Sequence, residues 1–122
     1  MDLAQLAEKE PPKQNKYNNV KTETGGIRFD SKKEAERYEY LMALLKAGEI
    51  TDLKLQHTFT LQEAYKDPDG EKVTGIKYIA DFTYYDSAGN FIIEDVKGVK
   101  TDVYKIKKKL MAARGYRIQE VQ

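Results

Sequence analysis

The stretch from Ile76 to Lys97 constrains the fold more than any other part of the chain, because it reads as a β-hairpin. Two apolar runs, IKYIADFTYY and FIIEDVK, are separated by the segment DSAGN. Runs rich in β-branched and aromatic residues, bounded by Asp, Gly and Asn, are typical of strands joined by a tight turn. The sequence therefore predicts two antiparallel strands, at residues 76–85 and 91–97.

Acidic residues stand within these two strands, where a half-buried hairpin usually carries none. Side chains alternate across a strand, so Asp95 and Lys97 share one face of the second strand. Pairing about a turn centred near Ala88 places Asp81 opposite Asp95. Two facing carboxylates repel each other unless a cation lies between them. Lys97 is one candidate for that cation, and a divalent metal ion, which prefers oxygen ligands, is another.

A simpler interpretation of the same residues is open. Asp81 and Asp95 would lie exposed at strand ends, and Lys97 would form a surface ion pair that contributes little to stability. Three features favour a binding site instead: the apolar neighbours of Asp81, the matching register, and a basic segment directly after Lys97.

The rest of the chain predicts a mixed α/β domain with a central mixed sheet flanked by helices, in the order α-β-β-β-α-β. The first helix has the clearest signals, because Ser31 and Glu34 form a capping box at its start and Gly48 suits a left-handed residue after its end. Apolar residues recur along it at helical spacing. Besides the hairpin strands, the predicted elements are a helix between Ser31 and Gly48, strands at 50–65 and 116–121, and a helix at 101–114.

Length and composition limit the class of protein. A chain of 122 residues forms one domain. Residues 1–25 are polar, which predicts a poorly ordered tail before a single domain at 26–122. The absence of cysteine excludes disulfides and thiolate metal sites. No apolar run reaches the length of a membrane helix, and the N-terminus does not resemble a signal peptide, so we expect a cytoplasmic protein with no membrane partner.

Charge is unevenly distributed, although the net charge is only +1. Between Lys97 and Arg117, eight Lys or Arg residues accompany a single acid, Asp102. A solvated helix face is a common reason for such a run. A nucleic-acid partner is another, because basic side chains neutralise backbone phosphates.

An acid on one strand followed by acid-x-Lys on the next resembles the signature of the PD-(D/E)xK nuclease superfamily, which has the restriction-endonuclease-like fold. The matching residues here are Asp81 and then Asp95-Val96-Lys97. The predicted order of elements over about residues 26–120 is similar to the core of that family. Segments such as YIADFTYY and IIEDVKG resemble small phage-encoded members grouped near Holliday-junction resolvases and the endonuclease subunits of some transposition systems.

The resemblance implies a deoxyribonuclease that hydrolyses phosphodiester bonds with Mg²⁺ or Mn²⁺. Selectivity for DNA structure, a role in phage recombination or replication, and a homodimeric state are further implications, as is a phage or prophage gene expressed in the cytoplasm of a bacterial host. Two alternatives stay open: a DNA-binding module of the same fold that does not cut, and a protein-interaction domain that uses its tyrosines.

The resemblance also implies roles for individual residues. The catalytic residues would be Asp81, Asp95, Lys97 and Glu34, and the metal ligands Asp81, Asp95, Val96 and Glu34. The DNA contacts would be Lys100, Lys105, Lys108 and Lys109, with Gln56 as a further candidate for the site. Glu36 and Glu39 are alternatives to Glu34, which serves as a helix cap in the simplest interpretation. A bulge in the strand would bring Glu94 into the place of Asp95.

Overall fold

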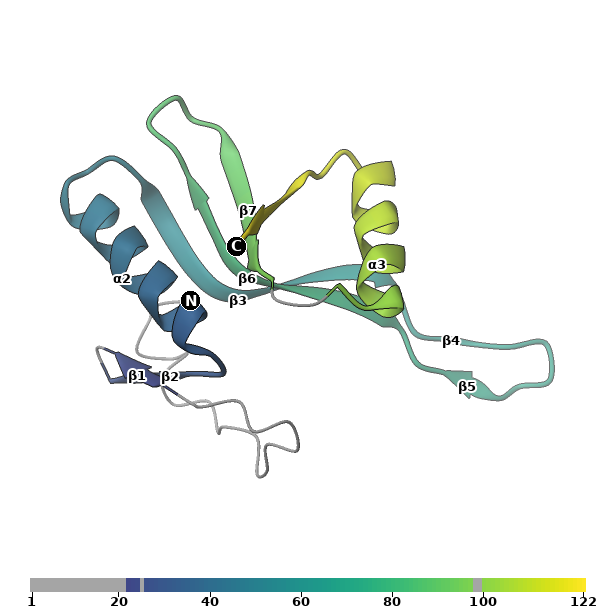
Figure 1. Cartoon of the computed structure of the whole chain (residues 1–122). Coiled ribbons are helices and arrows are strands. Elements are labelled where there is room, and N and C mark those ends of the chain that lie inside the picture. The colour runs from purple at the N-terminus through teal and green to yellow at the C-terminus, as the bar shows by residue number, and fades with distance from the viewer. Residues whose placement is uncertain (1–21, 25, 98–99) are drawn as a thin grey trace.

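A four-stranded mixed sheet with the strand order β3-β6-β7-β8 forms the centre of the molecule (Figure 1). The structure, a computed structural model, describes residues 22–24, 26–97 and 100–122. The first three strands of the sheet pair antiparallel and the last pair is parallel. The main elements are β3 (Thr51–Gln62), β6 (Ile76–Tyr85), β7 (Phe91–Val96), β8 (Ile118–Val121), α2 (Lys32–Lys46) and α3 (Asp102–Ala113). The fold is mixed α/β around a mixed sheet, as the sequence predicts.

Two small ribbons stand outside the central sheet. β1 (Thr22–Thr24) pairs with β2 (Ile27–Phe29), so part of the segment predicted as a tail forms a strand. The rest of that predicted tail, residues 1–21 and 25, lies outside the described residues. β4 (Tyr65–Lys66) pairs with β5 (Lys72–Val73) in a ribbon that extends away from the body (Figure 1).

Hydrogen bonds made by Asp86 stabilise the turn between β6 and β7. The amide of Asp86 donates to the carbonyl of Asn90 at 2.9 Å, and the Asp86 carboxylate accepts from the amides of Ala88 and Asn90. Gly89 has a φ of 84°, which a residue with a side chain rarely adopts. This turn fixes the register, in which Phe82 faces Glu94 and Tyr85 faces Phe91.

α2 and α3 each begin with a side-chain cap. Ser31 caps α2 by accepting from the amide of Glu34 at 3.1 Å, and Thr101 caps α3 by accepting from the amide of Tyr104. The cap of α2 therefore places Glu34 in the first helical turn, next to the sheet. None of the helices in the described ranges is long and apolar enough to cross a membrane.

The core is divided into two clusters, one under each helix. Leu53, Leu55, Phe82 and Tyr84 pack with α2, whereas Leu61, Tyr78 and Ala80 pack with Tyr104 and Met111 of α3. Alternate residues of one strand, such as Ala80 and Phe82 of β6, normally share one face of a sheet. Here they face α3 at one end of the β3–β6 ribbon and α2 at the other. The change occurs at Gln56 of β3 and Asp81 of β6, and Gln56 has a left-handed φ of 53°. The ribbon is therefore sharply twisted where the candidate site residues lie.

Candidate active site

Asp81 and the end of β7 meet at the twist of the ribbon. The Asp81 carboxylate accepts a hydrogen bond of 2.8 Å from the amide of Val96. The β6–β7 register, extended by one residue beyond the pair Phe82–Glu94, brings Asp81 opposite Asp95. A hydrogen bond to Asp95 and the negative charge of Asp95 are among the causes that raise the pKa of Asp81. The two acids are therefore direct neighbours.

Asp95 is held by two partners on the α3 side of the sheet. Its Oδ2 accepts from the Tyr78 hydroxyl at 2.6 Å and lies 3.1 Å from the ammonium of Lys97. The residue is 3% exposed. Burial and the bond to Asp95 raise the pKa of Tyr78, so its hydroxyl keeps its proton and donates. Two contacts to the same oxygen thus fix the orientation of the carboxylate.

Lys97 is also held in place. Its ammonium lies 3.9 Å from the centre of the Tyr104 ring, within the range of a cation–π contact. Its backbone amide donates to Val121 at the end of β8. The side chain is 20% exposed, so the charge lies at the edge of the site and can still reach a ligand.

Glu34 faces this group from the first turn of α2. Its Oε1 lies 3.4 Å from the Gln56 side-chain nitrogen, a long hydrogen bond. Burial, followed by the charges of Asp30 and Asp95, raises the pKa of Glu34 to about 7, while Lys97 opposes the shift. Of the alternatives, Glu36 is exposed, and Glu39 accepts from the Thr24 hydroxyl of β1 at 2.7 Å.

Burial and the neighbouring acids raise the pKa of both Asp81 and Glu34. Burial, the charge of Glu34 and the contact with Asp95 raise the pKa of Asp81 to about 9, although the Val96 amide opposes the shift. Three carboxylates beside one ammonium leave a surplus of two negative charges when all are ionised. Asp81 relieves this surplus by keeping a proton.

Glu94 lies on the opposite face of β7 from Asp95 and Lys97. Its side chain is fully buried and accepts from the Arg37 guanidinium at 2.8 and 2.6 Å. The Tyr84 hydroxyl donates to the same carboxylate. A bulge that would exchange Glu94 and Asp95 does not occur, so Glu94 belongs to the core under α2.

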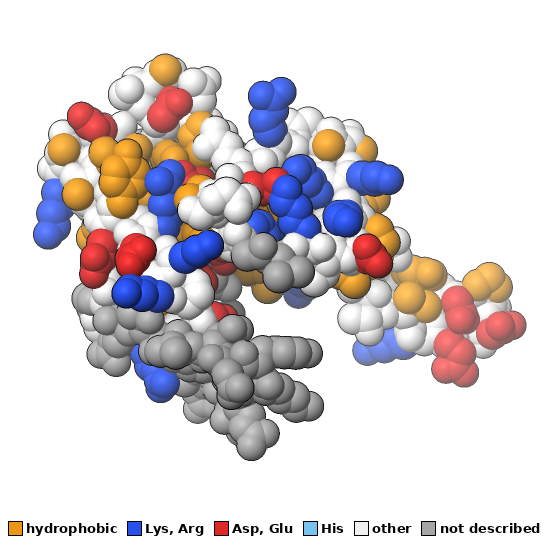
Figure 2. All heavy atoms as spheres, viewed as in Figure 1, with side chains coloured by type: hydrophobic (Ala, Val, Ile, Leu, Met, Phe, Trp, Pro, Cys, Tyr) orange, Lys and Arg blue, Asp and Glu red, His pale blue; other side chains and the backbone are white. Residues whose placement is uncertain are grey.

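The basic residues after Lys97 divide into two groups. Lys100 and Lys108 form ion pairs with Glu120 at 3.0 and 3.2 Å, and the Tyr104 hydroxyl donates to the same carboxylate. These contacts lower the pKa of Glu120 to about 2. Lys105 and Lys109 are exposed, and Lys and Arg side chains gather over α3 in Figure 2. Of the four lysines predicted to contact DNA, Lys100 and Lys108 are therefore held by Glu120, whereas Lys105 and Lys109 are exposed.

Sequence reasoning missed the residues that hold the site together. Tyr104 was visible only as an apolar position, and Tyr78 was one of the tyrosines of the interaction-domain alternative. Tyr78 is buried instead, and the hydroxyl of each residue donates to an acid of another segment. Arg37 lies 57 residues from its partner Glu94. Helical spacing gives one signal in retrospect, because Arg37 follows Glu34 by three residues and so lies on the same side of α2.

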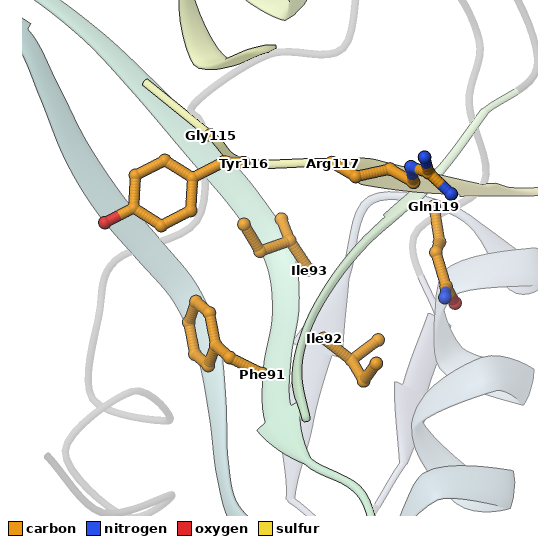
Figure 3. Close-up of a pocket in the computed structure, with 7 residues that line it drawn as sticks. All are labelled: Phe91, Ile92, Ile93, Gly115, Tyr116, Arg117 and Gln119. Atoms are coloured by element: carbon orange, nitrogen blue, oxygen red, sulfur yellow. The ribbon is translucent and has the colours of Figure 1, made fainter. Parts of the chain in front are cut away.

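A hollow of about 350 Å³ opens at the other end of β7, where the chain leaves α3 for β8. Figure 3 shows its lining: the rings of Phe91 and Tyr116 lie beside Ile93, and the polar side chains of Arg117 and Gln119 lie further along. None of the predicted site residues lines this hollow. It is separate from the acidic group.

The acidic group could hold a divalent cation only together with further oxygen ligands. Within residues 22–24, 26–97 and 100–122, no three His, Cys, Asp or Glu side chains are grouped so as to hold a metal ion by themselves. Mg²⁺ generally takes only one or two carboxylates and completes its shell with water and substrate oxygens. Asp81 and Asp95 are the two neighbouring carboxylates that could take this role.

Comparisons with known proteins give a family without an activity. No curated protein matches the chain, and no solved structure matches it either. One family, described as a protein of unknown function (DUF1064), matches residues 14–122. Since that range includes the central sheet, α2 and α3, the chain belongs to the DUF1064 family.

Proposed function

We propose that this protein is a Mg²⁺- or Mn²⁺-dependent deoxyribonuclease with a restriction-endonuclease-like core. The observation that carries the proposal is the meeting of Asp81, Asp95 and Lys97 at the twist of the sheet, with Glu34 facing them from α2. Acids on neighbouring strands, with a lysine two residues after the second, also form the signature that the sequence resembles.

Asp81 and Asp95 provide the first ligands for the cation in this proposal. One oxygen of each is engaged within the protein, Asp81 Oδ2 by the Val96 amide and Asp95 Oδ2 by Tyr78 and Lys97. The carboxylates of Asp81 and Asp95 are the donors assigned to the cation, whose binding would replace the hydrogen bond between the two acids, and Glu34 and the backbone of Val96 complete the predicted set. When bound, the cation polarises the scissile phosphoryl group and lowers the pKa of the attacking water.

Lys97 acts on the phosphate directly. Its ammonium is fixed between the Asp95 carboxylate and the Tyr104 ring, so little reorganisation is required when negative charge develops on the phosphoryl oxygens. Glu34 faces the same point from α2 and completes the ligands of the cation, so its carboxyl group would lose its proton when the cation binds. Gln56 orients the Glu34 carboxylate.

DNA approaches from the side of α3 in this proposal. Lys105 and Lys109 are exposed and contact backbone phosphates, which gives affinity without sequence preference. Lys100 and Lys108 divide their charge between Glu120 and the DNA, because both remain nearly half exposed within their ion pairs.

Cleavage assays test the proposal with linear duplex and four-way-junction DNA, in the presence of Mg²⁺ or Mn²⁺. We expect metal-dependent cleavage by the wild-type protein and a loss of at least about a hundredfold for Lys97→Met or Asp81→Asn. Glu34→Gln should also reduce cleavage, whereas its matched control Glu36→Gln should not. Both variants change a glutamate on α2, and only Glu34 faces the site. Cleavage that survives Asp81→Asn would show that the nuclease assignment is wrong.

The non-cutting alternative has a distinct result. NMR titration with Mg²⁺ should shift the amides of Val96 and Lys97 if the acids hold a cation. DNA-induced shifts in residues 100–114 without any metal-induced shift near Val96, and without cleavage, would identify a DNA-binding module instead.

A further inference from the structure

The ribbon formed by β4 and β5 is an arm that projects from the molecule. Among the described residues, its strands pair with each other alone, Tyr65 with Val73 and Lys66 with Lys72, and Figure 1 shows the arm extending away from the sheet, α2 and α3. Ten residues of the arm, from Glu63 to Lys72, are exposed except for Asp67, which is half-buried. A two-stranded ribbon of this length is only marginally stable by itself, so a partner surface that covers its apolar side chains would stabilise the arm.

A register shift and a close approach of two backbones at the base of the arm fix its outward direction. The β3–β6 register shifts between Thr60 and Gln62, directly before the arm begins. Gly75 completes the base, because a Cβ at this position would lie 2.5 Å from the carbonyl oxygen of Gln62. The close approach of the two backbones is therefore possible only with glycine, and the direction of the arm is fixed by the chain itself.

The arm presents an apolar patch and an acidic tip. Tyr65 is 49% exposed and lies across from Val73, and Ile76 at the base is also exposed. At the tip, the Asp67 carboxylate caps the turn by accepting from the amides of Asp69 and Glu71, which leaves the Asp69 and Glu71 carboxylates outside the turn. Figure 2 shows acidic side chains gathered at the far end of the arm, away from the basic surface of α3.

α3 carries a surface with the complementary properties. Val103 and Ile106 are 61% and 59% exposed, and Leu110 is exposed as well. These three positions follow helical spacing and form one apolar stripe on the side of α3 that faces solvent. Lys107 borders the stripe on one side, whereas Lys105 and Lys109 lie on the other. A phosphate backbone would leave this apolar stripe without a partner.

We propose that the arm of one chain docks on the α3 stripe of a second copy, and that two such contacts form a symmetric dimer. Tyr65 and Val73 cover the apolar residues of α3, while Asp69 and Glu71 face Lys107 of the other copy. A two-fold axis makes the two contacts identical, so each subunit gives an arm and receives one. Lys105 and Lys109 remain outside the contact and available to DNA.

Charge reversal distinguishes this contact from any other dimer. We expect the full chain to sediment as a dimer at low ionic strength, in the absence of DNA and metal. Lys107→Glu alone, and Asp69→Lys with Glu71→Lys alone, should each raise the dissociation constant by about tenfold or more, because both contacts then place like charges together. An equimolar mixture of the two variants should restore the dimer, since each arm again meets an α3 of opposite charge.

Apolar substitutions provide a second, independent measurement. Ile106→Glu should dissociate the dimer, whereas Ile79→Glu is its matched control, because Ile79 is 45% exposed on β6 and outside both surfaces. Far-UV circular dichroism of each variant checks that it folds. The proposal is wrong if the wild-type chain is monomeric at about 100 µM, or if the mixed charge variants do not associate. Neither outcome depends on nuclease activity, so the dimer and the proposed function can fail separately.

Discussion

Replacing Arg37 by methionine should destabilise the protein strongly, because it leaves the buried carboxylate of Glu94 without its cation. The Glu94 side chain is fully buried, and Arg37 donates two hydrogen bonds to it at 2.8 and 2.6 Å. Methionine keeps most of the aliphatic volume of arginine, so the change removes chiefly the guanidinium. Among the described residues, the Tyr84 hydroxyl alone then remains as a side-chain donor to the carboxylate.

Removing one partner of a buried ion pair costs about 3–5 kcal/mol. That is a large part of the roughly 5–15 kcal/mol by which a typical domain is stable. For a domain of this size, each kcal/mol lowers the melting temperature by about 4–8 °C. We therefore expect Arg37→Met to lower the melting temperature by at least about 12 °C.

Urea unfolding followed by circular dichroism measures the effect, with Lys33→Met as the control on an exposed position of α2. The double variant Arg37→Met with Glu94→Gln should lose less stability than the sum of the two single changes, because it no longer buries an unpaired charge. If Arg37→Met unfolds within about 1 kcal/mol of the wild type, Glu94 does not depend on this pair and the argument fails.

Three further outcomes follow from the candidate site and α3. The folded protein raises the pKa of Asp81 to about 9, so it binds more protons than the unfolded chain and its metal-free stability should fall as pH rises from about 4 to 9. Thermal melts should show that Asp81→Asn is more stable than the wild type at pH 9. An equal pH dependence of the two proteins would contradict this expectation. The pKa of Glu120 is lowered instead, to about 2, so Glu120→Gln should lower the melting temperature at pH 7. The melting temperatures of the variant and the wild type should converge as pH falls towards 2, and a difference that persists at that pH would not come from this charge. Lys105→Ala should reduce the slope of log K against log salt for DNA binding by about one, and Lys108→Ala by less because Glu120 already holds it; equal slopes in fluorescence-anisotropy titrations would rule out that phosphate contact.

Local signals in the sequence were sufficient for the hairpin and for the choice between its two acids. The segment from Asp86 to Asn90 encodes its own turn, because the Asp86 side chain bonds to amides only two and four residues away. The register follows from that turn. Alternation then places Asp95 with Lys97 and sends Glu94 to the other face, which is the arrangement in the structure.

Contacts between distant segments could not be predicted in the same way. The pairing of Lys108 with Glu120 depends on how α3 packs against β8, and nothing near either residue specifies it. The arm was also missed. Its turn signals, Asp-Pro and Asp-Gly, were visible, but the end of β3 at Gln62 depends on the close approach of Gly75 from the returning strand. Single-sequence patterns contain no direct record of such approaches.

The left-handed residue Gln56 connects the fold to the site. A non-glycine residue at a φ of 53° inside a strand costs on the order of 1 kcal/mol, so the surrounding structure must hold it there. At this position β3 changes from packing under α2 to packing under α3, and β6 makes the same change at Asp81. Without the twist, Glu34 of α2 and the pair formed by Asp95 and Lys97 would lie on separate faces of the sheet. The strain at Gln56 is thus the local cost of bringing acids from both sides to one point.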